Sequence, residues 1–411
     1  MIACTMANPA FDVPIASDAD TRGDGDGDPS GDGDGDPTGD GDGDPTGDGD
    51  GDPTGDGDGD PTGDGDGDPT GDGDGDGDGD PDPQCAAPAE YIDCDIVGQG
   101  ITQDPFAAIG LGCPSGSEQG IEITNQSMSA ADPSSWRIAK YFGLATGPNH
   151  GGMLWAAREF QVVPSGDPDI PAIQPNTSAA ILLLSTGVLP SVNFDGGVIV
   201  PFDAQVGYGE NLNPNGGAFP APISPTHGSN FGQGGTPFIN CDGANDCSDS
   251  LHHQWYELGW NSLNDKLALQ FTMTTPAGVH GYIFDFAFFS SEYPTFIDTM
   301  YNDMFVAWSD SETYTGNLTF IGAAPMNTTS LAEAGGFEYV ELDPALDATG
   351  FELNAGTGWL LARGPATPGE KVQVTLSVSD LGDALFGSVV LIDNFRWDCV
   401  GCEGDDCGFT P

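Results

Sequence analysis

Oxygen-bearing side chains gather at the ends of predicted strands in the last third of the chain. They are Glu292, Asn302, Asp303, Asp380, Asp383 and Asp393, with Asn394 next to the last of them. Carboxylate and amide oxygens, about six to eight around one ion, are the ligands that Ca²⁺ takes in proteins. The set therefore predicts a calcium site, and Ca²⁺ is the one cofactor that we expect.

Two other interpretations of these residues remain open. Asp and Asn at turns hydrogen-bond the local backbone, and the set could serve only that purpose on a soluble acidic surface. Glu292 and Asp383 could instead form the paired acids of a glycan-active hydrolase, if their side chains face each other across a cleft. The sequence contains no G-x-S-x-G, H-E-x-x-H or phosphate-binding G-x-x-x-x-G-K-[ST] motif. We expect no catalytic residue.

The elements that must position these acids are short strands with alternating hydrophobicity. Leu267, Leu269, Phe271 and Met273 point to one face of a strand over Lys266–Thr275. The same alternation predicts strands over Gly281–Phe289 and Lys371–Asp380, and weaker patterns predict strands over Ala180–Leu184, Gly197–Val200, Met304–Trp308, Leu318–Ile321, Tyr339–Leu342 and Ser388–Trp397. One helix is predicted, over Ser134–Phe142. The pattern indicates an all-β globular domain, a β-sandwich or jelly roll with loop insertions.

Several sequence blocks in this region resemble the choice-of-anchor L domain family across about 265–397. They are Phe284 to Pro294, Tyr301 to Phe305, Gly350 to Trp359, Pro365 to Glu370, Ser379 to Asp383 and Ser388 to Phe395, with Leu182 to Gly187 as an earlier strand. The resemblance implies an extracellular bacterial β-rich domain that is displayed on the cell surface through differing anchors.

The charge of the chain excludes some partners. Of its 411 residues, 8 are Lys or Arg and 65 are Asp or Glu, for a formal net charge of -57. A nucleic-acid partner requires cations against the phosphates, so we expect none. Anionic membrane surfaces would repel the chain for the same reason, and no apolar run reaches the roughly 18 residues of a membrane span. Any membrane contact must then come from a lipid anchor.

Much of the acidity lies in one repetitive segment. Residues 23–84 repeat the octad GDGDGDPT, with 24 Asp and no aliphatic or aromatic side chain between Asp24 and Asp82. Such a segment cannot bury apolar area against its conformational entropy, so it predicts a disordered acidic linker. Its Asp-x-Asp-x-Asp spacing is that of an EF-hand loop, but the Glu required at loop position 12 is missing. The linker divides a segment 1–22 from a globular domain at 85–411.

The N-terminus carries a short motif for lipid attachment. Met1-Ile2-Ala3-Cys4 resembles the end of a bacterial lipoprotein signal, in which Cys4 becomes the lipidated first residue. An ordinary cytosolic start is the alternative. A long spacer directly after Cys4 is what a surface lipoprotein needs to clear the membrane. We therefore expect an extracellular, lipid-anchored protein at the outer cell surface.

The remaining eight cysteines favour an oxidising compartment. They are Cys85, Cys94, Cys113, Cys241, Cys247, Cys399, Cys402 and Cys407. An even number beyond the linker predicts disulfides, with Cys241 paired to Cys247 across one loop and the other pairings open. Zinc binding by Cys399, Cys402 and Cys407 is the alternative.

Aromatic and histidine side chains give weaker indications. Phe288, Phe289 and Trp308 are predicted core residues, whereas Trp255, Tyr256 and Trp260 could form an exposed sugar-stacking surface. His252 and His253 point to opposite faces if they lie on a strand, so a shared metal is not expected. Taken with the resemblance, these observations predict an exported binding or adhesion module with an unknown extracellular ligand, a glycan or a protein. The alternative is the secreted hydrolase.

Overall fold

The computed structural model describes residues 104–112, 121–130, 132–147, 152–158, 160–163, 172–175, 179–202, 217–224, 246–247, 251, 263–321, 324–382, 384–402 and 407–410. Within these ranges the chain is mostly β-strand in antiparallel sheets, so the predicted all-β fold is confirmed. None of the helices in these ranges is long and apolar enough to cross a bilayer. The predictions for 1–22, for the linker at 23–84 and for Cys4 lie outside the described residues.

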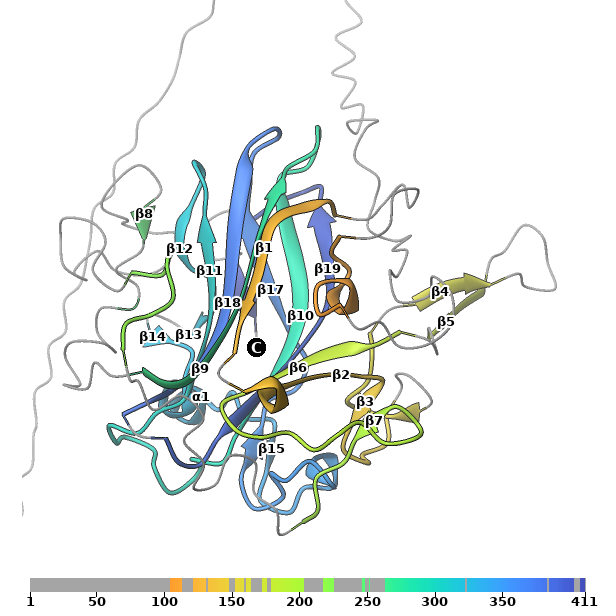
Figure 1. Ribbon diagram of the computed structural model, residues 1–411, viewed down its shortest axis with the longest axis vertical. Helices are drawn as coiled ribbons and strands as arrows, with labels where there is room; N and C mark the ends of the chain where they lie inside the picture. Colours follow the sequence, from red (N-terminus) through yellow and green to blue (C-terminus); the bar gives the residue numbers. More distant parts are fainter. Residues whose placement is uncertain are drawn as a thin grey trace, which may run out of the picture. The chain divides into compact units, whose positions relative to one another are not determined.

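Two sheets build the domain (Figure 1). The six-stranded sheet has the order β1 (Ile123–Ser129), β9 (Leu263–Thr274), β18 (Lys371–Leu381), β11 (Met304–Asp310), β12 (Thr315–Asn317), β8 (Asp246–Cys247). The eight-stranded sheet has the order β15 (Tyr339–Val340), β16 (Ala355–Gly356), β10 (Gly281–Ser290), β19 (Ser388–Asp398), β6 (Ile181–Ser185), β2 (Trp136–Ala139), and β17 (Leu360–Pro365) joins β10 to β20 (Gly408–Thr410).

The smaller elements form pairs and turns beside the sheets. The strand pairs are β3 (Tyr141–Phe142) with β7 (Gly197–Val198), β4 (Phe160–Val163) with β5 (Ala172–Pro175), and β13 (Phe320–Ile321) with β14 (Ala324–Pro325). The helical elements are α1 (Thr328–Ala334) and the 3-10 turns η3 (Ala107–Ile109), η4 (Pro133–Ser135) and η8 (Pro344–Leu346). Each of the nine predicted strands coincides with an observed strand, with bounds that shift by a few residues.

The main core lies between the two sheets, and the sequence alternation explains it. Tyr282, Phe284, Phe286 and Phe288 of β10 enter one core cluster together with alternate residues of β9, β18 and β11. Neighbouring Phe rings pack edge-on and stacked; Phe284 stacks on Phe395 with ring centroids 5.2 Å apart. Burial of one such side chain stabilises the fold by about 1.5–3 kcal/mol. The two sheets are therefore held together as a sandwich.

Both sheets are also covered on their other face. Ala287 and Phe289 of β10 pack with Phe142, Trp155 and further apolar residues in a second cluster. Trp308 lies in a third cluster on the far side of the six-stranded sheet. Phe288, Phe289 and Trp308 are each at most 1% exposed, which confirms them as core residues. Strand β10 is buried along its whole length because apolar layers cover both of its faces.

The helix predicted over Ser134–Phe142 is wrong. That segment contains the 3-10 turn η4 and then strands β2 and β3. β2 pairs with β6 from Trp136↔Leu184 to Ala139↔Ile181, and these backbone hydrogen bonds override the local helical pattern. The observed helix α1 was not predicted; it begins after Asn327, whose side chain and Ser330 form a reciprocal capping box.

Cysteine pairing is described in part. Cys402 and Cys407 form a disulfide, and Cys399 is disulfide-bonded as well, so these three do not bind zinc. The Cys402–Cys407 bridge closes a short loop directly before β20 at the edge of the eight-stranded sheet. The predicted Cys241–Cys247 pairing, together with Cys85, Cys94 and Cys113, lies outside the described residues.

Candidate metal centre

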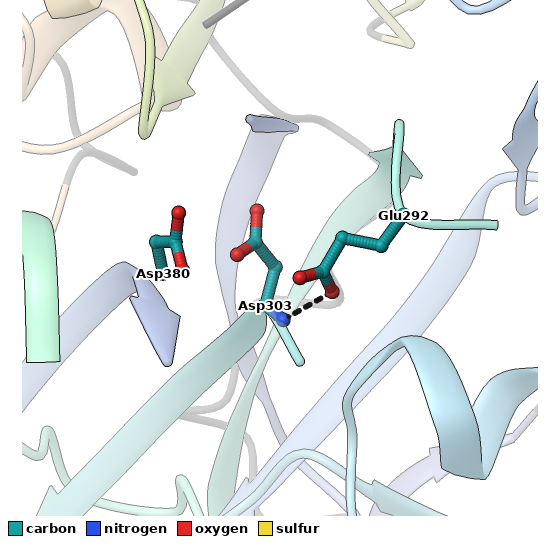
Figure 2. A group of neighbouring side chains, drawn as sticks. All are labelled: Glu292, Asp303 and Asp380. Atoms are coloured by element: carbon teal, nitrogen blue, oxygen red, sulfur yellow. Dashed lines mark hydrogen bonds between the residues drawn. The ribbon is translucent and has the colours of Figure 1, made fainter. Parts of the chain in front are cut away.

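Three of the predicted ligands converge at one end of the sandwich. One carboxylate oxygen each of Glu292, Asp303 and Asp380 lie within 4.8 Å of one another. Figure 2 shows Asp303 between the other two side chains. All three residues are buried, at 1%, 0% and 1% exposure. We call these residues the acid cluster.

Two neighbouring strands of the six-stranded sheet supply the two aspartates. Asp303 immediately precedes β11, and Asp380 is the penultimate residue of β18. Because the strands are antiparallel and Met304 pairs with Ser379, one further step along the register sets Asp303 beside Asp380. A β-bulge opposite Ser379, with Asp265 of β9 at φ 46°, breaks the regular pairing directly before Asp380.

The glutamate comes from the opposite sheet. Glu292 follows the end of β10, and its Oε2 accepts a hydrogen bond from the backbone N–H of Asp303 at 2.6 Å (Figure 2). The hydroxyl of Thr328, at the first position of α1, donates to the same oxygen at 3.2 Å. The acid cluster therefore joins the two sheets.

Hydroxyl side chains that sequence reasoning missed surround the cluster. The Thr186 hydroxyl donates to Asp303 Oδ2 at 3.4 Å and accepts from the Ser388 N–H at 2.8 Å. The buried Ser388 Oγ has no hydrogen-bond partner among the described residues. A Thr directly after a predicted apolar strand, as Thr186 follows Leu182 to Ser185, was the available signal for this arrangement.

The electrostatics of the cluster call for positive charge. Two carboxylates about 4.8 Å apart repel by about 3–4 kcal/mol per pair at an effective dielectric constant of about 20. A cation bound among the three oxygens turns this repulsion into attraction. Two ligands on opposite sides of Ca²⁺ lie about 5 Å apart, whereas around Mg²⁺ they lie about 4 Å apart. Separations of at most 4.8 Å between the three oxygens are compatible with ligands around Ca²⁺.

The other predicted ligands do not join the acid cluster. Asn302 is adjacent in sequence, but its Oδ1 accepts from the Thr329 N–H at 3.1 Å and so holds the start of α1. Asp383 lies outside the described residues. Asp393 is five residues into β19 from Ser388, roughly 17 Å along the strand, and lies in a separate cluster with Asn394. Asp393 therefore lies apart from the acid cluster, in a different group of residues.

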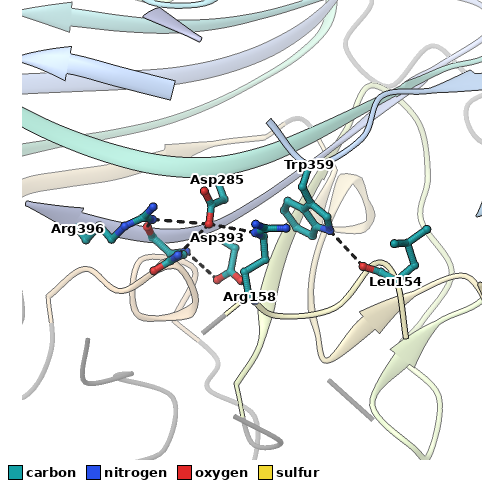
Figure 3. Close-up of polar contacts among 7 residues, drawn as sticks. Leu154, Arg158, Asp285, Trp359, Asp393 and Arg396 are labelled. Atoms are coloured by element: carbon teal, nitrogen blue, oxygen red, sulfur yellow. Dashed lines mark hydrogen bonds and ion pairs between the residues drawn. The ribbon is translucent and has the colours of Figure 1, made fainter. Parts of the chain in front are cut away.

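That second group of residues pairs its acids with arginines (Figure 3). Asp285 Oδ2 lies 3.2 Å from Arg158 Nε and 3.6 Å from an Arg396 terminal nitrogen, and it accepts from Asn394 Nδ2 at 2.8 Å. Asp393 Oδ2 accepts from the backbone N–H of Arg158 at 2.6 Å. The guanidinium of Arg158 also lies 5.4 Å from the ring centre of Trp359. We call this group the arginine cluster.

A bulge in β19 explains the arginine cluster. Asp285 and Asp393 are direct cross-strand partners, an arrangement of like charges that is destabilising by itself. The register shifts between Ile283 and Asp285, where Asn394 has φ 57°. This extra residue brings the Asn394 amide to Asp285 and returns the following Phe395 to the core.

The remaining sequence-based sites lie outside the described residues: His252, His253, Trp255, Tyr256 and Trp260. Neither protein-family models nor curated proteins give a match to this chain. The resemblance to the choice-of-anchor L domain therefore stays a prediction, and the site is interpreted from its own geometry.

Proposed function

We propose that this chain is an exported, surface-displayed bacterial binding or adhesion module, stabilised by a calcium ion at the acid cluster. The observation that carries the calcium part is the burial of three carboxylates, from both sheets, within 4.8 Å of one another. Buried charges of one sign are costly unless a cation compensates them.

The oxygen chemistry of the site supports this metal. Glu292, Asp303 and Asp380 would hold the ion, and the Thr186 hydroxyl already donates to Asp303. Bound Ca²⁺ would supply charge neutralisation and would tie the end of β10 to β11 and β18. Its role in this proposal is structural, because side chains at most 1% exposed have little access to an external ligand.

Three further features support export and display. The Gly-Asp repeat at 23–84 has the composition of an extended soluble spacer, and Cys4 precedes it in a lipobox-like motif. The Cys402–Cys407 disulfide fits an oxidising compartment. We propose the outer cell surface as the location, a lipid at Cys4 as the anchor, and a glycan or protein as the ligand.

The hydrolase alternative gains no support from the described geometry. A glycosidase acid must contact the scissile bond of its substrate. Glu292, the acid proposed for that role, is 1% exposed, and its Oε2 is engaged by the Asp303 N–H and the Thr328 hydroxyl. We therefore retain the binding module as the proposed function.

Thermal unfolding of the full chain in chelator and in millimolar Ca²⁺ tests the metal. We expect Ca²⁺ to raise the Tm of the wild type and to leave the Asp303→Asn variant unchanged. Asp310→Asn, at the opposite end of the same strand, is the matched control and should respond like the wild type. Diffuse ion binding by the 24 Asp of the linker is the same in all three proteins. A wild-type Tm that does not respond to Ca²⁺ would refute the calcium site.

Labelling with a radioactive fatty acid in a bacterial host tests display. Incorporation that disappears in Cys4→Ser, combined with exposure of the protein on intact cells, would support the anchor. An unlabelled protein found in the cytoplasm would contradict it.

A further inference from the structure

A cavity lies on the far side of the eight-stranded sheet from the main core. Its volume is about 670 Å³, within the range of small-molecule sites. Its walls come from residues around Ala145 and Leu154 and from the turn that contains η8. The acid cluster and the arginine cluster contribute no residue to it.

One wall of this cavity is apolar although it faces solvent. Leu144, Phe202 and Leu342 line it and are 48%, 58% and 66% exposed. The Tyr339 ring lines it as well and packs edge-on against the buried Trp155 at 5.5 Å. Exposed large apolar side chains that gather around one hollow mark a binding site more often than scattered ones do.

The remaining wall is acidic. Asp343, Asp347 and Glu352 all line the cavity, and among the described residues no Lys, Arg or His does. Glu352 is only 5% exposed, and neither of its carboxylate oxygens has a hydrogen-bond partner among the described residues. Burial raises the pKa of Glu352, and the charge of Asp347 adds to this; nearby backbone N–H groups lower it only in part. The carboxylate thus lies near backbone N–H groups, but the described lining of the cavity offers it no counter-charge, and a buried charge without one is costly.

The backbone holds this cavity in shape. The Leu342 N–H donates to the Glu352 carbonyl at 2.6 Å, and the Leu144 N–H donates to the Asp347 carbonyl at 2.8 Å. Leu342 and Ala348 have φ of 67° and 59°, a conformation that non-glycine residues rarely adopt and that recurs at ligand sites. These hydrogen bonds tie the two sides of the cavity to each other.

We propose that this cavity binds an organic cation, a primary ammonium group on an alkyl stem. The ammonium would lie against Glu352, with Asp343 and Asp347 adding negative potential, and the stem would lie along Leu144, Phe202 and Leu342. A lysine side chain of a partner protein and a free alkylamine share this chemistry. A neutral sugar would leave the Glu352 charge uncompensated.

Calorimetric titration of the full chain at moderate salt, where diffuse binding to the linker is screened, tests the cavity. The probes are n-pentylammonium and, as a neutral analogue, n-pentanol. We expect saturable binding of the ammonium at least about tenfold tighter than that of the alcohol, since each tenfold step is about 1.4 kcal/mol. The Glu352→Gln variant should lose that preference. Glu333→Gln, an exposed acid on α1 with the same change of charge, should retain it.

A second pair of probes separates the two sources. If Nα-acetyl-lysine methylamide binds as tightly as pentylammonium, and Nε-acetylation abolishes its binding, the ligand is a lysine side chain of a protein. If only pentylammonium binds, the ligand is a free amine. Equal affinity for pentylammonium and pentanol, or an unchanged preference in a folded Glu352→Gln protein, would overturn the proposal. Because Asp303→Asn leaves this cavity intact, failure of the calcium site does not affect the outcome.

Discussion

The arginine cluster, on β10 and β19, and the acid cluster, at the ends of β10, β11 and β18, both bury carboxylates but surround them differently. In the arginine cluster, Asp285 is surrounded by two guanidinium groups and an amide that belong to the chain itself. In the acid cluster, beyond the end of β10, three carboxylates meet within 4.8 Å. The comparison teaches that the first cluster pairs its central carboxylate with cations of the chain itself, whereas in the second we propose that an added cation takes that role. Substitutions in the arginine cluster should therefore change the stability of the protein by the same amount with and without metal, whereas the effect of substitutions in the acid cluster should depend on metal.

The largest effect is expected from removing the centre of the arginine cluster. Asp285→Ala leaves the Arg396 guanidinium, 16% exposed, with the Asn394 carbonyl but without its counter-charge, and loss of one member of a buried ion pair costs about 3–5 kcal/mol. Chemical denaturation should show this loss equally in chelator and in Ca²⁺. Arg158→Ala should cost less, about 1 kcal/mol, because that side chain is 37% exposed. If the effect of Asp285→Ala depends on Ca²⁺, the proposal that only the acid cluster responds to metal is contradicted.

The next effect is the calcium response of the acid cluster. At a ligand concentration about 100-fold above Kd, binding to the folded state alone adds about 2.7 kcal/mol, and a domain of this size gains about 2–4 °C in Tm per kcal/mol. Asp303→Asn should abolish this gain. In chelator the variant should be at least as stable as the wild type, because one of three like charges is gone. A variant that is equally destabilised in both conditions would indicate a hydrogen-bonding role for Asp303 alone.

A smaller effect is expected at the hydroxyl that supports Glu292. Thr328→Val keeps the shape of the side chain and removes hydrogen bonds to Ser290 and Glu292. The loss of a hydrogen bond to a charged group costs about 1.5–3 kcal/mol, and we expect the lower end because the 3.2 Å contact is long. Thr329→Val, at the next and less buried position, is the control, because it removes only the exposed hydrogen bond that its hydroxyl accepts from the Asp298 N–H. If the two variants unfold at the same temperature, Thr328 has no special role.

The smallest effect concerns Glu352, a buried acid outside both clusters, and it depends on pH. Burial raises the pKa of its carboxyl above 4.5, so at pH values between the ordinary and the raised pKa the folded protein binds more protons than the unfolded chain. Stability therefore falls as pH rises through this range. Glu352→Gln should raise Tm slightly at neutral pH, and the difference should vanish as the pH falls to the ordinary value. Melting curves of both proteins across pH measure this; a constant difference would exclude titration as its cause.

The sequence by itself determined the strands and their inner faces. Alternation at Tyr282, Phe284, Phe286 and Phe288 is a local property with a period of two, and it identified both β10 and the side that faces the core. It also located acids at the strand ends, because polar residues at turns interrupt the apolar pattern. These local signals were enough to predict the all-β fold and to select the three acids of the acid cluster as candidate ligands.

Only the tertiary structure decided which acids meet. Asp303 and Asp380 are neighbours because β11 pairs with β18, whereas Asp393 accepts a hydrogen bond from the Arg158 N–H. The strand character of Trp136–Ala139 arises from its pairing with β6, and the cavity at Glu352 from a turn packed against residues about 200 positions earlier. Contacts between distant residues depend on register, bulges and sheet packing, and the hydrophobic period of a single strand carries no information about its partner.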